Sequence, residues 1–211
     1  MRAQDPAQDP IVVRLRDQSV EETLATYIDL VAGSPDKADV AALALREQGR
    51  LGRLKESHLD MLIKCVELAP NLLCLGHLAK ALAAMGRKAM KASDALVQKL
   101  GPMVIADDVE YWSFDGAVWA LGYLGGAKVS SFLDTLAKEP QLRSVRSPVY
   151  RGVMPRPARQ KQFASAIAGA RGLAEKSDPG LWRTRMITTP LTRPAQAKST
   201  GRAWDVRAAV A

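Results

Sequence analysis

Hydrophobic residues recur along most of this chain with the three- and four-residue spacing of amphipathic helices. Between residues 19 and 139, each such stretch begins near a capping residue and ends at a glycine or a proline. One helix is expected to begin after Asn71, with Leu75 and Leu82 on its buried side. The pattern predicts a helical region without strands.

The boundaries of the helices are marked by short local signals. Ser19 and Glu22 have the spacing of a capping box, in which each side chain can bond the backbone N–H of the other residue. Further starts are predicted at Pro35, Ser57, Asn71, about Ser93 and about Val129, and stops at Gly33, Gly49, Pro70, Gly86, Gly101-Pro102 and Pro140. Each boundary is expected from residue type alone.

The phrase Ala-Leu-x-x-x-Gly occurs three times. It runs from Ala44 to Gly49, from Ala81 to Gly86 and from Ala120 to Gly125, at offsets of 37 and 39 residues. A repeat of this length, with a turn glycine after each amphipathic stretch, is typical of stacked helical hairpins.

The last copy of the phrase carries a family resemblance. The segment 119–128, Trp-Ala-Leu-Gly-Tyr-Leu-Gly-Gly-Ala-Lys, is followed by Phe132, Leu133 and Leu136 and resembles a short bacterial HEAT repeat. Residues 81–100 resemble a second copy, and the likeness covers about residues 35–139. Gly126 and Arg87 stand where HEAT repeats commonly have Asp. The resemblance implies an all-α fold, a HEAT-like α-α solenoid of about three helical hairpins, within residues 19–139.

Two flanking regions lack this pattern. Residues 1–18 contain prolines in the near-duplicate Ala-Gln-Asp-Pro, and we expect a flexible N-terminal arm with a short extended piece at 11–15. Residues 140–211 are expected to form a basic linker, one helix at about 158–176 and a partly extended tail.

Charge divides the chain at the same boundary. Residues 1–139 hold 16 Lys and Arg against 19 Asp and Glu, whereas residues 140–211 hold 14 against 3. The basic segment interleaves arginine and tryptophan, which predicts a partner-binding arm formed by Arg151, Arg156, Arg159, Trp182, Arg183, Arg185 and Trp204. A protein, a nucleic acid and the acidic body of the same chain are all possible targets.

A second candidate site is an aromatic stripe in the last repeat. Trp112, Asp115, Trp119 and Tyr123 share one side of a predicted helix and form a possible partner-binding surface. Alternatively, the small-residue helix around residues 164–172 covers this stripe as an end cap. Tryptophan beside aspartate is also similar to the alkylpurine DNA glycosylases of HEAT-like architecture, although their paired-aromatic site is not reproduced residue for residue.

Other reactive residues favour structural roles. The acidic run at Asp107, Asp108, Glu110 and Asp115 could form a metal or acid/base cluster, but it lies at a helix start, where carboxylates complement the helix dipole, and this structural role is favoured. His58 and His77 lie in different helices without triad or zinc spacing, and Cys65 and Cys74 are expected to be reduced, buried thiols. We therefore expect no metal, no cofactor and no enzyme activity.

The sequence contains neither an apolar run of about 18 residues nor a visible secretory signal, which favours a cytoplasmic protein. The expected function is a non-enzymatic adaptor or structural subunit that binds a protein partner in a multi-subunit assembly. The alternative is a nucleic-acid-binding HEAT-like protein, including a glycosylase-like enzyme.

Overall fold

The computed structural model describes residues 6–105, 111–126, 128–138 and 156–176. Within these ranges every regular element is a helix, which confirms the all-α class. The α-helices are α1 (Pro10–Asp17), α2 (Val20–Gly33), α3 (Ala38–Arg50), α4 (Leu59–Leu68), α5 (Leu72–Ala84), α6 (Ser93–Ile105), α7 (Tyr111–Leu124), α8 (Val129–Lys138) and α10 (Arg156–Lys176). Short 3-10 helices are η1 (Pro6–Gln8), η2 (Pro35–Lys37), η3 (Glu56–His58) and η4 (Gly86–Ala92).

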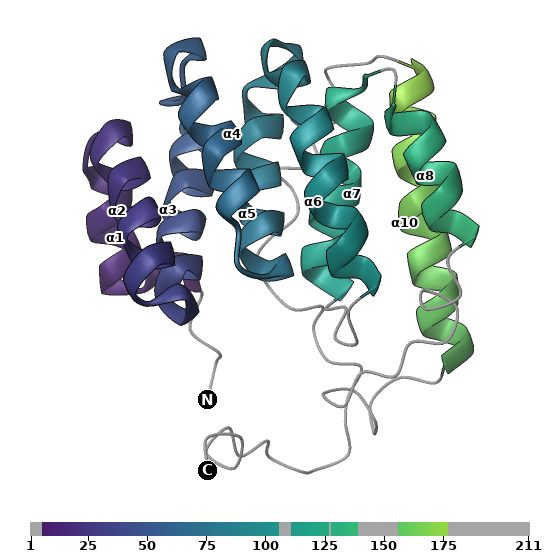
Figure 1. Ribbon diagram of the computed structural model, residues 1–211, viewed down its shortest axis with the longest axis horizontal. Coiled ribbons are helices and arrows are strands. Elements are labelled where there is room, and N and C mark those ends of the chain that lie inside the picture. The colour runs from purple at the N-terminus through teal and green to yellow at the C-terminus, as the bar shows by residue number, and fades with distance from the viewer. Residues whose placement is uncertain (1–5, 106–110, 127, 139–155, 177–211) are drawn as a thin grey trace.

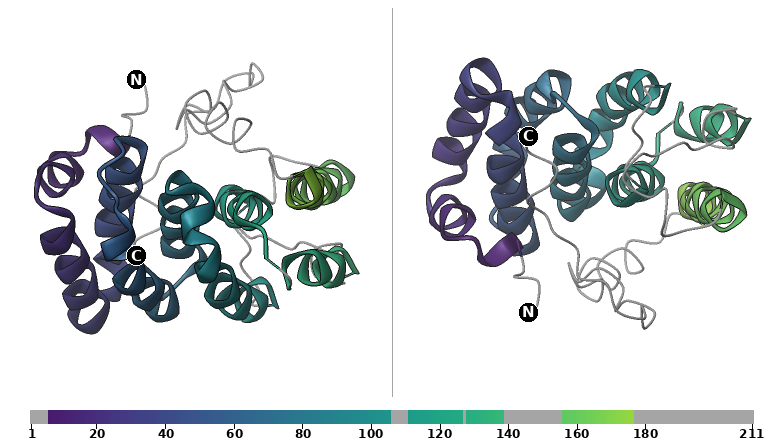
Figure 2. Two further views of the ribbon diagram at one scale, coloured as in Figure 1. Left: turned by 90° about the horizontal axis from the view of Figure 1, so that it is seen from above. Right: turned by 90° about the horizontal axis from the view of Figure 1, so that it is seen from below.

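The α-helices lie in two rows (Figures 1 and 2). The first row consists of α1, α3, α5, α7 and α10, and each of these contacts the next. The second row consists of α2, α4, α6 and α8 in the same way. The first-row helices end, and the second-row helices begin, at the edge that is uppermost in Figure 1, which we call the upper edge. It includes residues 51–58 and 86–92.

The core lies between the two rows and follows the predicted hydrophobic stripes. Leu75, Leu78 and Leu82 of α5 are fully buried. On α7, Phe114, Val118, Leu121 and Leu124 are also fully buried, and Phe114 and Leu121 take the positions of Leu75 and Leu82. The predicted helical period therefore identifies the buried side of both helices correctly.

Neighbouring first-row helices approach closely at small residues. A Cβ atom on Gly49 of α3 would lie 3.2 Å from the carbonyl oxygen of Ala81, and one on Gly76 of α5 would lie 2.8 Å from that of Ser113. A Cβ atom on Gly122 of α7 would overlap the backbone of Ala170 in α10. Hydrogen at these positions allows the first-row backbones to pack directly against each other.

Three first-row helices are followed by a glycine in the left-handed region. Gly52, Gly86 and Gly125 have φ values of 72°, 70° and 69° after α3, α5 and α7. Gly49, which the repeated phrase places at the end of a helix, instead lies inside α3 and is buried. The turn glycine of that helix is Gly52, because a residue without Cβ adopts this backbone conformation at little cost.

Successive second-row helices are linked by pairs of oppositely charged or hydrogen-bonding side chains. In each pair, an acidic side chain at the second position of one helix contacts a basic residue near the start of the next. The pairs are Glu21 with His58 (2.9 Å), Asp60 with Lys91 (2.7 Å) and Asp94 with Lys128 (2.7 Å). Exposed pairs contribute little stability, about 0.2–1 kcal/mol each. The three pairs matter here because they occur at the same positions of successive helices and so show a recurring register.

The expected extended piece at residues 11–15 is wrong, because residues 10–17 form helix α1. The Asp9 side chain accepts a hydrogen bond from the Ile11 backbone N–H at 2.8 Å, and Pro10 occupies the first helical position. Val12 and Leu15 are buried against α3. Pro10 therefore begins this helix and does not disfavour it.

Two other boundary predictions are wrong, whereas two cap predictions are confirmed. Helix α6 continues through Pro102 to Ile105, and its last turn is held by Val104, which is fully buried. Ser57 lies within η3, and α4 begins at Leu59. The capping box at Ser19 and the cap at Asn71 are present as predicted.

Candidate functional site

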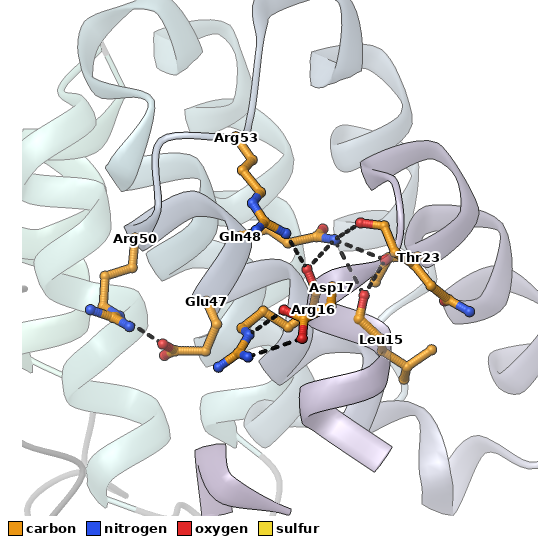
Figure 3. A network of polar contacts seen from close by, with 9 residues as sticks. Leu15, Arg16, Asp17, Thr23, Glu47, Gln48, Arg50 and Arg53 are labelled. Atoms are coloured by element: carbon orange, nitrogen blue, oxygen red, sulfur yellow. Dashed lines mark hydrogen bonds and ion pairs between the residues drawn. The ribbon is translucent and has the colours of Figure 1, made fainter. Parts of the chain in front are cut away.

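A buried polar network joins the first three helices (Figure 3). The two N–H hydrogens of the Gln48 amide of α3 are shared among the carbonyl oxygens of Leu15, Arg16 and Gln18, at 3.1–3.3 Å from the nitrogen, and the Thr23 hydroxyl, at 3.0 Å. These carbonyls belong to the last turn of α1 and its C-terminal cap, where a helix lacks internal donors. The network therefore holds α1 and α2 on α3, and it presents no group that could act on a ligand.

Charged side chains surround this network at the surface. Arg53 donates to the Arg16 carbonyl oxygen at 2.7 Å, and Arg50 pairs with Glu47 at 2.7 Å. A hydrogen bond from Arg16 lowers the pKa of Asp17. These contacts reinforce the attachment of α1 to α3. They also occupy the guanidinium groups of Arg16, Arg50 and Arg53.

The aromatic stripe on α7 is divided between two neighbours. A Cβ atom on Gly169 of α10 would overlap the Trp119 ring, so α10 lies directly against this tryptophan. The Tyr123 hydroxyl instead lies 3.8 Å from the position of a Cβ on Gly86, at the end of α5. The arrangement agrees with the end-cap alternative for Trp119. The Trp112 side chain is outside the described residues.

The exposed side of the first row has a polar character between α5 and α7. His77, Lys80 and Asp115 are half-buried, and the Lys80 side chain lies over Gly116 of α7. Burial, followed by the positive charges of Arg46 and Lys80, holds the pKa of His77 well below its usual range. His77 is therefore neutral near pH 7 and lies within a positive local field.

The other reactive residues have structural surroundings. His58 bonds Glu21 through Nε2, and its Nδ1 accepts the Lys55 backbone N–H at 3.0 Å. Cys65 and Cys74 are buried free thiols, and burial raises the pKa of each to about 12. Such thiols are almost wholly protonated at neutral pH and therefore poor nucleophiles.

Part of the predicted site lies beyond what the structure describes. Arg156 and Arg159 belong to the first turn of α10, but their side chains are outside the described residues. Also outside are the acidic run at 107–110 and the predicted arm residues Arg151, Trp182, Arg183, Arg185 and Trp204. Within the described ranges, no three His, Cys, Asp or Glu side chains are grouped so that they could hold a metal ion.

None of the described helices is both long and apolar enough to cross a membrane. Comparison with known proteins found no matching family model, no similar curated protein and no similar solved structure.

Proposed function

We propose that this protein is a HEAT-like α-α solenoid and that it acts as a non-enzymatic adaptor or structural subunit. The observation that carries this proposal is the recurring register of the two rows. A left-handed glycine follows three first-row helices, and an acidic residue of one second-row helix pairs with a basic residue before the next. Repeat scaffolds with this plan offer an extended surface for binding.

The proposed partner-binding region has two parts. One is the outer side of the first row, where the half-buried Lys80 and Asp115 lie on the neighbouring helices α5 and α7. The other is the Arg/Trp arm, in which Trp182 is the proposed aromatic anchor because buried tryptophans contribute strongly to protein interfaces. Trp119 contributes mainly by packing α10 onto α7.

Nucleic-acid binding is the second candidate, and the 14 basic residues against 3 acidic ones in residues 140–211 favour it. A protein partner agrees better with the rest of the chain. Residues 1–139 carry more acidic than basic side chains, and this body would repel a phosphate backbone. Trp119 belongs to the tryptophan and aspartate pattern that is similar to the DNA glycosylases, and it packs against Gly169 of α10.

A salt titration with two ligands tests the proposal. The ligands are a protein that co-purifies with the full chain from its native host and a short DNA duplex. We expect Trp182→Ala to weaken binding of the protein by about 2 kcal/mol, with a modest dependence on salt. The control is Leu68→Ala, which truncates an exposed apolar residue at the C-terminal end of α4 and should leave the affinity unchanged.

The nucleic-acid alternative predicts a different result. The affinity for DNA would fall steeply with salt, and Arg183→Ala combined with Arg185→Ala would reduce the log–log slope by about two. If the affinity for DNA falls steeply with salt and Trp182→Ala does not change the affinity for the protein, nucleic-acid binding replaces the adaptor proposal. If the chain binds neither ligand at low salt, the proposal is wrong.

A further inference from the structure

The upper edge carries exposed apolar and basic side chains, and its segments 51–58 and 86–92 contain one exposed acid, Glu56. The apolar and basic residues come from the segment after α3 and from η4 after α5, and we call them the upper ridge: Leu51, Arg53, Lys55, Arg87, Lys88 and Met90. The two segments are neighbours, because Asp60 at the start of α4 pairs with Lys91 of η4 at 2.7 Å. Close packing of Gly49 against Ala81 and Ala84 fixes the helices beneath them.

The apolar members of the upper ridge are accessible to solvent. Leu51, which directly precedes the left-handed Gly52, is 46% exposed, and Met90, in the 3-10 helix η4 that begins at Gly86, is 49% exposed. Large apolar side chains grouped among cations are typical of interaction surfaces. Methionine and arginine are also enriched at protein interfaces.

The charges of the ridge differ from those beside it. Lys91 and Lys128 are paired with carboxylates of the second row. Arg87 and Lys88 are exposed, and within the part of the chain that the structure describes their side chains form no ion pair. Lys55 is also exposed and in no ion pair there, but it lies near enough to Glu21 to help lower the pKa of that carboxyl, and Glu56 follows it in sequence. Cations after α5 complement its dipole, but this explains neither Lys55, five residues beyond α3, nor the exposed leucine and methionine.

We propose that the upper ridge docks an acidic peptide segment of the partner protein, with apolar side chains on Leu51 and Met90 and carboxylates on Lys55, Arg87 and Lys88. The inference rests on the proposed adaptor function and names the chemistry of its partner. The basic segment 140–211 of the same chain is the wrong occupant, because its 14 basic residues against 3 acidic ones would be repelled.

Nucleic acid is also a poorer occupant of the ridge. The segments 50–58 and 86–91 contain no phenylalanine, tyrosine or tryptophan on which a base could stack. The exposed aliphatic side chain of Leu51 and the thioether side chain of Met90 instead favour apolar groups of a peptide. The argued ligand is therefore a protein segment rather than a phosphate backbone.

The test uses the full chain and a fluorescein-labelled peptide of about a dozen residues that contains glutamate and leucine. Fluorescence anisotropy compares it with the same peptide carrying glutamine for glutamate, with one carrying serine for leucine and with a DNA oligonucleotide of similar length. We expect the chain to bind the glutamate–leucine peptide most tightly. Tighter binding of the DNA, or no binding of the glutamate–leucine peptide, would overturn the proposal.

Charge variants separate the ridge from the basic arm. Arg87→Glu with Lys88→Glu should weaken binding of the acidic peptide at least about tenfold. Arg183→Glu with Arg185→Glu makes the same change of net charge in the arm and should have a smaller effect. If the arm variant has the larger effect, the peptide binds the arm and the ridge proposal is wrong.

Uncharged variants test the apolar part. Leu51→Ser with Met90→Ser should weaken binding of the leucine-containing peptide on the order of tenfold and leave binding of the serine-containing peptide unchanged. Leu68→Ser with Leu73→Ser, which alters two similarly exposed leucines at the opposite edge, is the matched control and should have no effect. Equal effects of the two pairs would contradict a specific ridge.

The two proposals can fail separately. If the ridge variants bind the co-purified partner like wild type while Trp182→Ala loses it, the ridge proposal is wrong and the adaptor function remains. If neither Trp182→Ala nor the ridge variants change partner binding, the partner uses neither surface and both proposals are wrong.

Discussion

At the scale of single residues, Gln48 connects parts of the chain that are 25–33 residues apart in sequence. Its side-chain amide is fully buried and serves carbonyl groups at the end of α1 as well as the Thr23 hydroxyl. Buried carbonyls that lose their donors cost free energy because they also lose water. No local sequence pattern identifies this role, since the partners are brought together only by the packing of α1 and α2 on α3.

This network predicts a measurable loss of stability. Gln48→Met keeps the length of the side chain and removes the donor. Because the Leu15 and Arg16 carbonyls keep other donors, the free energy of unfolding in urea should fall by about 1 kcal/mol. Gln98→Met on α6 makes the same change at an exposed position and should change it by less than about 0.5 kcal/mol. Equal effects at both positions would mean that other groups or water satisfy these carbonyls.

At the scale of helices, local signals predict an element well when its cap is made by adjacent residues. Ser19 and Asn71 cap helices as their types suggest. Helix α1 has such a signal in Asp9 and Pro10, but the duplicated prolines hide it unless the pair is recognised as a cap and a first helical residue. The end of α6 is different, because burial of Val104 overrides the stop suggested by Gly101 and Pro102.

The contact between α7 and α10 predicts a second effect on stability. Gly122→Ala would place a Cβ against the backbone of Ala170, so the helices must separate and the free energy of unfolding should fall by about 1–3 kcal/mol. Trypsin should also cleave faster at Arg171 in α10. Gly33→Ala on α2, where a Cβ would meet nothing within 4 Å, should be neutral or stabilising. Similar behaviour of the two variants would contradict this close approach.

At the scale of the whole molecule, the sequence predicts helix class and hydrophobic stripes because these depend on period and residue type. The candidate sites depend on which helices meet. Trp119 and Tyr123 are close in sequence, yet one lies against α10 and the other near Gly86. The upper ridge likewise requires the neighbouring placement of residues 51–55 and 87–90, which lie more than thirty positions apart.

The proposed solenoid predicts how the chain unfolds. In a stack where each unit contacts mainly its neighbours, damage at one end should spread little to the other. Leu121→Asp buries an unpaired charge in α7, so hydrogen exchange should lose protection in α7, α8 and α10 and keep it in α1 to α4. Ala137→Asp adds the same charge at an exposed site of α8 and should preserve protection throughout. Loss of protection in all helices of Leu121→Asp would instead indicate one cooperative core, and the HEAT-like arrangement would have to be abandoned as the basis of function.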